Sequence, residues 1–145
     1  MQDLTQRRSD EHLVDADLTR TIIGCAMRVH RSLGPGFLES VYERALVHEL
    51  RMAGLKVEAQ KPLDVVYEGR TVGVFVADVV IEGRIVVENK ASASIAREHE
   101  AQLIHYLVAT GLDVGLILNF GSRSLQFKRK HRLPGARAAP STPPA

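Results

Sequence analysis

The 145 residues of this chain, 45% of them hydrophobic, are enough for one domain with an apolar core of its own. The formal net charge of +2 is compatible with a polyanionic partner, but it falls short of the dense basic field that strong nucleic-acid binders carry. The single cysteine, Cys25, excludes an intramolecular disulfide, and neither a signal peptide nor an apolar run of about 18 residues is recognisable. We therefore expect a cytoplasmic protein without membrane spans.

The first third of the chain predicts a polar segment followed by two helices. Residues 1–16 are polar without clear periodicity, and we expect them to be mobile. From Asp17, a suitable N-cap, apolar residues recur at helical spacing until a Gly-Pro-Gly turn at 34–36 ends the first helix. A second helix is predicted over residues 38–53, before Gly54.

Polar side chains of these two helices have a structural and a functional interpretation. His30 lies near the end of the first helix, where the helix dipole favours a partly charged imidazole. Glu39, Tyr42 and Glu43 are spaced i, i+3 and i+4, so they share one face beside the Gly36 turn. An acid favoured by the dipole and a half-buried tyrosine would explain this face without any function.

Three successive antiparallel strands should follow. The first is predicted over residues 56–66, where Pro62 indicates a sheet edge or a bulge. A turn at Glu68-Gly69 leads into a second strand over 71–80, which continues into a further hairpin. Three strands after two helices indicate a mixed α/β or α+β fold.

The second hairpin places charges in an apolar context. Two β-branched runs meet at Glu82-Gly83, and they carry Asp78, Glu88 and Lys90. Each of these charges would cost several kcal/mol if it were buried without a partner, which suggests a site. Because side chains alternate along a strand, Glu88 and Lys90 lie on one face, about 6 to 7 Å apart.

The length of the hairpin loop decides whether Asp78 joins that face. A two-residue loop at Glu82-Gly83 would leave Asp78 on the opposite face. A three-residue loop over residues 81–83 would set Asp78 opposite Val86 and diagonal to Glu88, at about 7 to 8 Å. We predict the three-residue loop.

Two carboxylates and an ammonium on one sheet face have the chemistry of phosphodiester hydrolysis. Mg²⁺ or Mn²⁺ takes carboxylates, waters and phosphate oxygens as ligands, and a lysine neutralises charge that builds on a phosphate. The structural alternative is an ion pair between Glu88 and Lys90, with Asp78 at a strand end accepting backbone hydrogen bonds. Residue types alone leave both open.

A third helix is predicted over residues 96–110, closed by Gly111. Glu98, Gln102 and Tyr106 are spaced i, i+4 and i+8 and share one stripe of it. Gln102 and Tyr106 could hold a phosphate or the attacking water. A solvated face with i, i+4 hydrogen bonds is the alternative.

The remaining chain predicts two strands and a tail. The nearly continuous apolar run at 114–120 is typical of a strand buried on both faces, and a crossover would bring it into parallel pairing. A last strand over 124–130 runs into the basic cluster 128–132, which we interpret as a solvated end rather than a phosphate-contacting arm. Residues 133–145, rich in Pro, Ala, Gly and Ser, read as a disordered tail.

Three motifs resemble those of known nucleases. Asp78, followed after a hairpin by Glu88-Asn89-Lys90, resembles the Asp…Glu-x-Lys signature of the PD-(D/E)XK nuclease superfamily. The run from Gly36 to Tyr42 resembles the naming motif of the GxxExxY protein family, a branch of that superfamily. Gln102-Leu103-Ile104-His105-Tyr106 resembles the QxxxY motif of RecB-like nucleases. The similarity runs from about residue 18 to residue 129.

The resemblance implies a restriction-endonuclease-like core, a mixed five-stranded sheet flanked by three helices, over residues 17–132. It also implies a metal-dependent nuclease that hydrolyses nucleic-acid phosphodiester bonds, with DNA preferred to RNA. Asp78 and Glu88 would be ligands of Mg²⁺ (or Mn²⁺), beside the backbone of Val87 or Asn89. Lys90 would act on the water and the phosphate, and Gln102 and Tyr106 would line the substrate side. Glu39 would support the metal, and Tyr42 would orient Glu39.

Some features stay open. Asn89 suits a buried strand poorly, so we expect its side chain to meet solvent or the sheet edge to be near. His99 and His105 are six apart on a helix and make no zinc site. We recognise no separate recognition domain in the sequence. A nuclease of this size would therefore need an oligomer, such as a homodimer, or a partner for substrate specificity. The alternatives are a non-catalytic nucleic-acid- or protein-binding module that retains the fold, and a structural dimer formed through the sheet surface.

Overall fold

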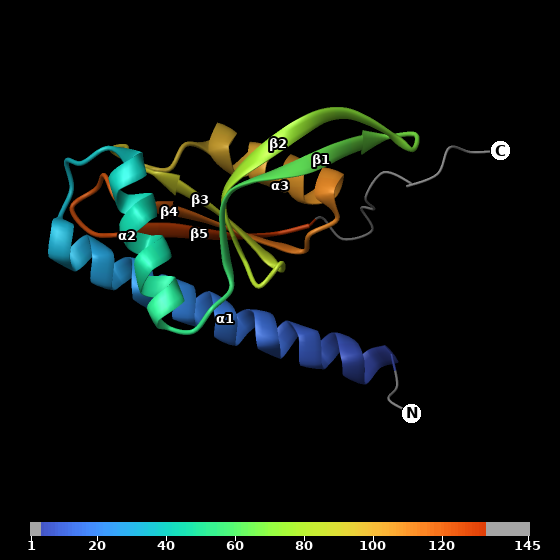
Figure 1. The fold of residues 1–145 in the computed structure, drawn as a ribbon, viewed down its shortest axis with the longest axis horizontal. Coiled ribbons are helices and arrows are strands. Elements are labelled where there is room, and N and C mark those ends of the chain that lie inside the picture. The colour runs from blue at the N-terminus through green and yellow to red at the C-terminus, as the bar shows by residue number, and fades with distance from the viewer. Residues whose placement is uncertain (1–3, 133–145) are drawn as a thin grey trace.

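The computed structural model describes residues 4–132, in which three helices pack on the two faces of a five-stranded mixed sheet (Figure 1). The elements are α1 (Leu4–Leu33), α2 (Glu39–Met52), β1 (Val57–Tyr67), β2 (Arg70–Ile81), β3 (Ile85–Lys90), α3 (Arg97–Thr110), β4 (Val114–Asn119) and β5 (Gln126–His131). The strand order is β1-β2-β3-β4-β5, and the β3–β4 pair is parallel, as a crossover through α3 requires. The predicted α/β architecture is therefore confirmed. None of these helices is long and apolar enough to cross a membrane.

The elements after residue 34 lie within two residues of their predicted bounds. Turn residues account for this agreement. Glu68 and Gly69 have φ angles of 49° and 76°, the left-handed pair that a tight hairpin between twisted strands requires. Pro62 lies on β1 at the sheet edge, where a missing N–H is tolerated.

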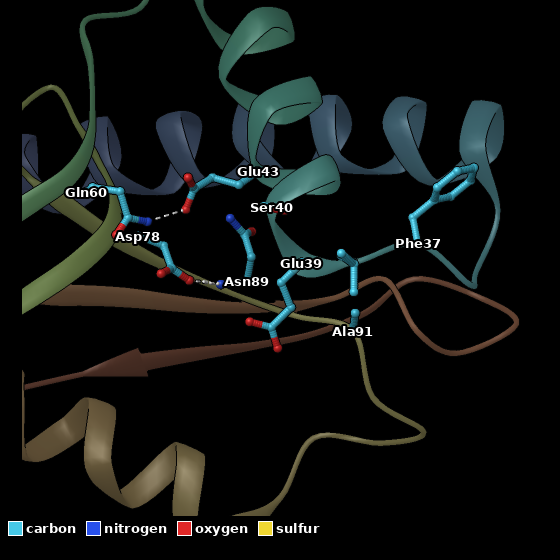
Figure 2. A pocket seen from close by; sticks show the side chains of 9 residues that line it. Phe37, Glu39, Ser40, Glu43, Gln60, Asp78, Asn89 and Ala91 are labelled. Carbon is cyan, nitrogen blue, oxygen red and sulfur yellow. Dashed lines mark hydrogen bonds between the residues drawn. The ribbon is translucent and has the colours of Figure 1, made fainter.

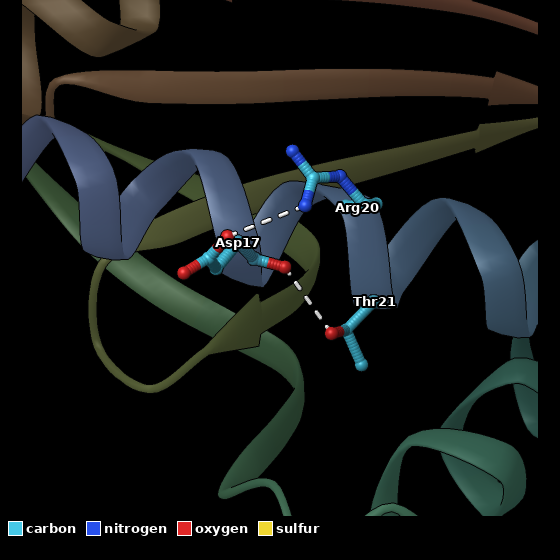
Figure 3. A network of polar contacts seen from close by, with 3 residues as sticks. All are labelled: Asp17, Arg20 and Thr21. Carbon is cyan, nitrogen blue, oxygen red and sulfur yellow. Dashed lines mark hydrogen bonds and ion pairs between the residues drawn. The ribbon is translucent and has the colours of Figure 1, made fainter.

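The start of α1 differs from the prediction. The helix begins at Leu4 rather than at Asp17, because residues 4–16 contain no glycine or proline that would end it. Figure 3 shows Asp17 inside the helix, where its backbone carbonyl accepts from the Thr21 hydroxyl at 3.2 Å and its carboxylate pairs with Arg20 at 3.5 Å. The predicted N-cap was therefore wrong. Residues 1–3 and the expected tail, 133–145, lie outside the described residues.

Two polar contacts hold α1 to distant parts of the chain. Asp15 is buried, and its carboxylate accepts a hydrogen bond from Nε of Arg84, in the turn between β2 and β3, at 2.8 Å. At the other end, Nε2 of buried His30 lies 2.9 Å from the carbonyl oxygen of Ser122, after β4. His30 does lie in the last turn, as predicted, but its contact is with this loop.

The sheet separates two apolar clusters. The larger one joins α1 and α2 to one face through Ile22, Leu46, Leu50, Val79, Ile81, Ile85, Val87, Leu116 and Leu118, among others. The smaller one joins α3 to the other face through Phe75, Ala77, Val80, Val86, Leu103, Leu107 and Ile117. Burial on both faces explains why β3 and β4 read as continuous apolar runs.

The segment after β3 packs closely against the end of β4. Asn119 is fully buried; its Oδ1 accepts from the backbone N–H groups of Ser92 (3.0 Å) and Gly121 (3.1 Å). Its Nδ2 donates to the Ser92 carbonyl (2.9 Å) and to Gln126 Oε1 (3.1 Å). A Cβ at Gly121 would lie 2.4 Å from the Ser92 nitrogen, so this contact needs glycine. These bonds fix the chain immediately after Lys90.

We expect Asn119→Leu to lower the free energy of unfolding by about 3 kcal/mol or more, because it leaves two backbone N–H groups and a carbonyl buried without partners. Gln126→Ala removes a single partner of the same amide and should cost about 1 kcal/mol or less. Urea denaturation of both variants measures the difference. Equal losses would contradict the central role of Asn119.

Candidate active site

The hairpin between β2 and β3 has a three-residue loop, as predicted, but at a position one residue further on. Ile81 pairs with Ile85, so the loop is formed by residues 82–84 and not 81–83. This register places both isoleucines, each fully buried, in the larger apolar cluster. Glu82 and Gly83 take the left-handed φ angles of 56° and 63° that the turn needs. Continuing the register sets Asp78 opposite Glu88, and not opposite Val86 as predicted.

The pairing of β2 with β3 ends at Val79 and Val87. Beyond this point, side chains take over backbone hydrogen bonds. The backbone N–H of Asp78 donates to Oε1 of Glu88 at 3.3 Å, and that of Asn89 donates to Oδ2 of Asp78 at 2.8 Å. Each carboxylate therefore binds the opposite strand, and the two acids lie together where the strands separate.

β2 also changes face at Asp78. Ala77 and Val80 both pack in the cluster beside α3, whereas Val79 packs in the cluster beside α1 and α2, so strict alternation is broken. The neighbouring strand is irregular at the same level. Gln60 has a φ angle of 50°, and the β1–β2 pairs pass from Ala59–Val79 to Lys61–Ala77.

Glu88 is the most strongly perturbed acid of the described residues. Burial, and then the charge of Asp78, raises its pKa to about 8, while Lys90 opposes this shift only weakly. In the metal-free protein the carboxyl group of Glu88 therefore keeps its proton at neutral pH. Two carboxyl groups held together in a partly buried gap are a suitable place for a cation.

Two pockets lie beside this pair. The first, of about 590 Å³, adjoins α2 (Figure 2) and is lined by Phe37, Leu38, Glu39, Ser40, Glu43, Gln60, Asp78, Asn89 and Ala91. The second, of about 190 Å³, adjoins α3 and is lined by Phe75, Glu88, Lys90, His99, Gln102, Leu103, Tyr106 and Ile117. The six predicted site residues are thus divided, with Asp78 and Glu39 in the first pocket and the other four in the second.

Glu43 and Gln60 also line the first pocket, and neither was predicted to belong to the site. Nε2 of Gln60 donates to Oε1 of Glu43 at 2.7 Å (Figure 2). Burial raises the pKa of Glu43, and the nearby carboxylates of Asp78 and Glu39 add to the shift. Its i+4 spacing from Glu39 could have revealed Glu43, whereas Gln60 is placed only by the pairing of β1 with β2.

Tyr42 does not orient Glu39, contrary to the prediction. Its side chain is fully buried, and its ring stacks on Phe120 with centroids 4.7 Å apart. The hydroxyl donates to the Gly34 carbonyl and accepts the backbone N–H of Phe37 at 3.2 Å. Tyr42 therefore fixes the loop before α2, and it places Glu39 only through that loop.

In the second pocket, the aromatic ring of Tyr106 stacks on Phe75 with centroids 3.7 Å apart, while Gln102 is exposed. His99, one helical turn before Gln102, lines the same pocket and has a buried Nδ1 without a partner. The sequence excluded His99 as a zinc ligand and left a structural or DNA-facing role open. Its i, i+3 spacing from Gln102 puts both residues on one side of α3 and was the sequence signal for this pocket.

No three His, Cys, Asp or Glu side chains within residues 4–132 are grouped closely enough to hold a metal ion. Asp78 and Glu88 offer two carboxylates, and a magnesium site in proteins is commonly completed by water, backbone carbonyls and substrate oxygens. The donors present therefore fit a hard cation that is bound together with a substrate.

The expectation for Asn89 was wrong. Its side chain is only 1% exposed, because β3 lies in the middle of the sheet with strands on both sides. Figure 2 shows the amide pointing toward α2. Neither its Oδ1 nor its Nδ2 has a hydrogen-bond partner.

The basic cluster at the C-terminal end is partly neutralised. Lys130 pairs with Glu100 of α3, and Arg132 pairs with Asp113 at 2.8 Å. Two of its cations therefore fasten β5 to α3 and to the turn after α3, so this part of the cluster is not the solvated end that was predicted.

The sequence profile of the PD-(D/E)XK nuclease superfamily matches residues 16–130, a range that contains every residue of both pockets. The chain belongs to the PD-(D/E)XK nuclease superfamily. Its three helices and mixed sheet are consistent with the restriction-endonuclease-like fold, and PD-(D/E)XK nucleases generally use divalent metal ions. A search of curated proteins gave no significant match.

The raised pKa of Glu88 predicts the pH dependence of stability in the metal-free protein. Because this pKa is about 8 in the folded state and 4.5 in a model peptide, the folded state binds the proton more tightly. The contribution of Glu88 to stability should therefore fall from pH 4.5 to pH 8, by at most about 1.4 kcal/mol per unit. Glu88→Gln should remove this part of the slope and be more stable than the wild type at pH 8.

Urea denaturation at pH 5, 6.5 and 8 in a chelating buffer tests this expectation. Glu98→Gln, which changes an exposed carboxyl on α3, is the matched control. If Glu88→Gln and Glu98→Gln gave the same pH dependence, the raised pKa of Glu88 would be disproved.

Proposed function

We propose that this PD-(D/E)XK protein is a magnesium- or manganese-dependent nuclease that hydrolyses phosphodiester bonds. The observation that carries the proposal is the meeting of Asp78 and Glu88 where β2 and β3 separate, with Lys90 in the same pocket as Glu88. Asp78 and Glu88 also accept backbone N–H groups of the opposite strand, but that structural role does not require a lysine beside them. Nucleic acid is the substrate that the superfamily implies.

Asp78 and Glu88 would hold the metal ion, together with a backbone carbonyl of Val87 or Asn89. When bound, the cation offsets negative charge that builds on the phosphate oxygens. It would also replace the proton that burial keeps on Glu88 at neutral pH. Glu39, in the first turn of α2, lines the pocket that contains Asp78 and would support the metal from that side.

Lys90 would position or deprotonate the attacking water and stabilise the phosphate. Lys90 lines the small pocket beside α3, where Gln102 and Tyr106 would contact the substrate. Tyr106 is held by its stack on Phe75, so its hydroxyl has a fixed position. The two pockets would therefore lie on either side of the scissile bond.

Finer assignments are also proposals. The run from Gly36 to Tyr42 supports membership of the GxxExxY branch. We propose DNA in preference to RNA, a homodimer as the source of specificity, a nuclease-like domain over residues 17–132, and a cytoplasmic location. A second candidate function, a non-catalytic binding module that retains the fold, is favoured by the modest net charge of +2.

Asp78→Ala and Lys90→Ala should each lower metal-dependent cleavage by about 100-fold or more, because they remove a metal ligand and the group that acts on the water. Asp78→Ala should also abolish Mg²⁺ or Mn²⁺ binding in calorimetry. Asp64→Ala and Lys128→Ala, at exposed positions of β1 and β5, are the matched controls. Cleavage that survives either site variant would overturn the assignment, and nucleic-acid binding without turnover by the wild type would favour the binding module.

Tyr106→Phe isolates the role of the tyrosine hydroxyl. The stack on Phe75 is kept, so we expect the thermal midpoint to stay within about 2 °C of the wild type. If the hydroxyl contacts the substrate, kcat/KM should fall by about tenfold. An unchanged kcat/KM would restrict Tyr106 to packing, and Tyr106→Ala would then act only through stability.

A further inference from the structure

The pocket beside α3 contains an imidazole to which the fold gives no partner. His99 lines this pocket together with Glu88, Lys90, Gln102 and Tyr106. Its Nδ1 is buried without a hydrogen bond, and within residues 4–132 its Nε2 has no hydrogen-bond partner either. Buried polar groups are normally paired, so this ring is suited to a group that enters the pocket from outside.

The two ring nitrogens of His99 have different surroundings. Nδ1 is enclosed and meets no acceptor, so a proton on it would be a buried donor without a partner. A neutral imidazole carries one N–H group and one lone pair, and these surroundings favour the proton on Nε2. Nε2, which is not enclosed, is therefore the atom that His99 offers to the pocket, as a hydrogen-bond donor.

Hydrogen-bond donors dominate the lining of this pocket. Lys90 brings an ammonium group, Gln102 an amide and Tyr106 a hydroxyl, whereas Glu88 is the one carboxyl group among the described residues that line it. The pocket beside α2, by contrast, has three carboxylates in its lining. Donors beside an ammonium bind oxyanions, and hydrogen bonds to a charged phosphate oxygen are stronger than neutral ones.

A metal ion is the other ligand that an imidazole commonly takes. Mg²⁺ and Mn²⁺ prefer oxygen ligands, and a zinc site would need further His, Cys, Asp or Glu side chains around His99. No three such side chains are grouped for a metal ion anywhere in the described part of the chain. His99 is therefore better suited to a phosphate oxygen than to a cation.

The packing of α3 holds His99 beside the acidic pair. The first turn of the helix is fastened to β5 by the ion pair between Glu100 and Lys130, and its inner face is buried in the smaller apolar cluster. His99 lies in this first turn, on the side of the helix that also carries Gln102. His105, six residues further on, is exposed on a different side of α3.

We propose that His99 binds a phosphate group of the substrate through its Nε2–H, beside Lys90. The proposal rests on the proposed function and adds a substrate-binding residue to that site. A lysine attracts a phosphate as a point charge, whereas a second donor at a fixed position also sets its orientation. His99 and Lys90 together therefore orient the phosphate next to the carboxyl groups that would hold the metal.

NMR of the imidazole nitrogens tests this contact without turnover. The full-length protein, labelled with isotope in its histidines and kept in Ca²⁺ in place of Mg²⁺, is titrated with short single-stranded and duplex DNA. We expect the Nε2–H signal of His99 to shift and that of His105 to stay in place. The spectra of His99→Gln and His105→Gln assign the two signals. No shift of His99 with either DNA would overturn the proposal.

Cleavage kinetics separate a donor from a packing residue. His99→Leu has no donor and should lower kcat/KM by about tenfold or more, whereas His99→Gln, whose amide N–H lies near the place of Nε2, should stay within about threefold of the wild type. Because Nδ1 has no hydrogen bond to lose, His99→Leu should not lower the thermal midpoint. His105→Leu, the matched control on the same helix, should cleave as the wild type does.

Equal losses of kcat/KM in His99→Leu and His99→Gln would overturn the donor role, and a lowered thermal midpoint of both would make His99 a structural residue. A DNA-dependent shift of His99 in a wild type that cleaves nothing would refute the nuclease proposal alone. Cleavage by His99→Leu at the wild-type rate would refute the phosphate contact alone.

Discussion

The site depends on the point at which β2 and β3 stop pairing. Beyond Val79 and Val87, the carboxylates of Asp78 and Glu88 accept the N–H groups that an opposing strand would otherwise satisfy. Because a buried N–H without a partner is costly, these acids are part of the secondary structure as well as of the candidate chemistry. An apolar residue at either position would leave a backbone donor unsatisfied.

The rest of the fold holds this opening in place. Asn119 binds the chain just after β3, and Tyr42 binds the loop just before α2. Asp15 holds the β2–β3 turn to α1. These contacts hold the chain on both sides of the point where β2 and β3 separate. The two acids are therefore kept close together without a metal ion, and the raised pKa of Glu88 is the result.

The sequence predicted most of the fold, because turn residues and apolar runs are local signals. The extra turns of α1 were missed, since nothing in residues 4–16 marks an end, and the hairpin loop was misplaced by one residue. That error did not hide the acidic pair, because shifting the three-residue loop by one position moved the partner of Asp78 from Val86 to Glu88. The side of the sheet on which Asp78 lies was not predictable, because β2 changes face at this residue.

What the sequence could not reveal depends on tertiary contact. The pairing of Gln60 with Glu43 joins β1 to α2, and no spacing within either element indicates it. The burial of Asn89 follows from the place of β3 in the middle of the sheet, which is known only once the strand order is known. The role predicted for Tyr42 was wrong because helical spacing shows only that Tyr42 and Glu39 are near each other on α2. It does not show that the Tyr42 hydroxyl binds the loop before α2.

The hydrogen bond between Asp78 and residue 89 has a consequence for how such a protein can change over evolution. Asp78 accepts the main-chain N–H of that residue, which every amino acid except proline supplies. The side chain at position 89 is thus free to vary without loss of this bond. Selection could exchange that one side chain, and with it the lining of the pocket beside α2, while the acids and the lysine on either side of it stay constant.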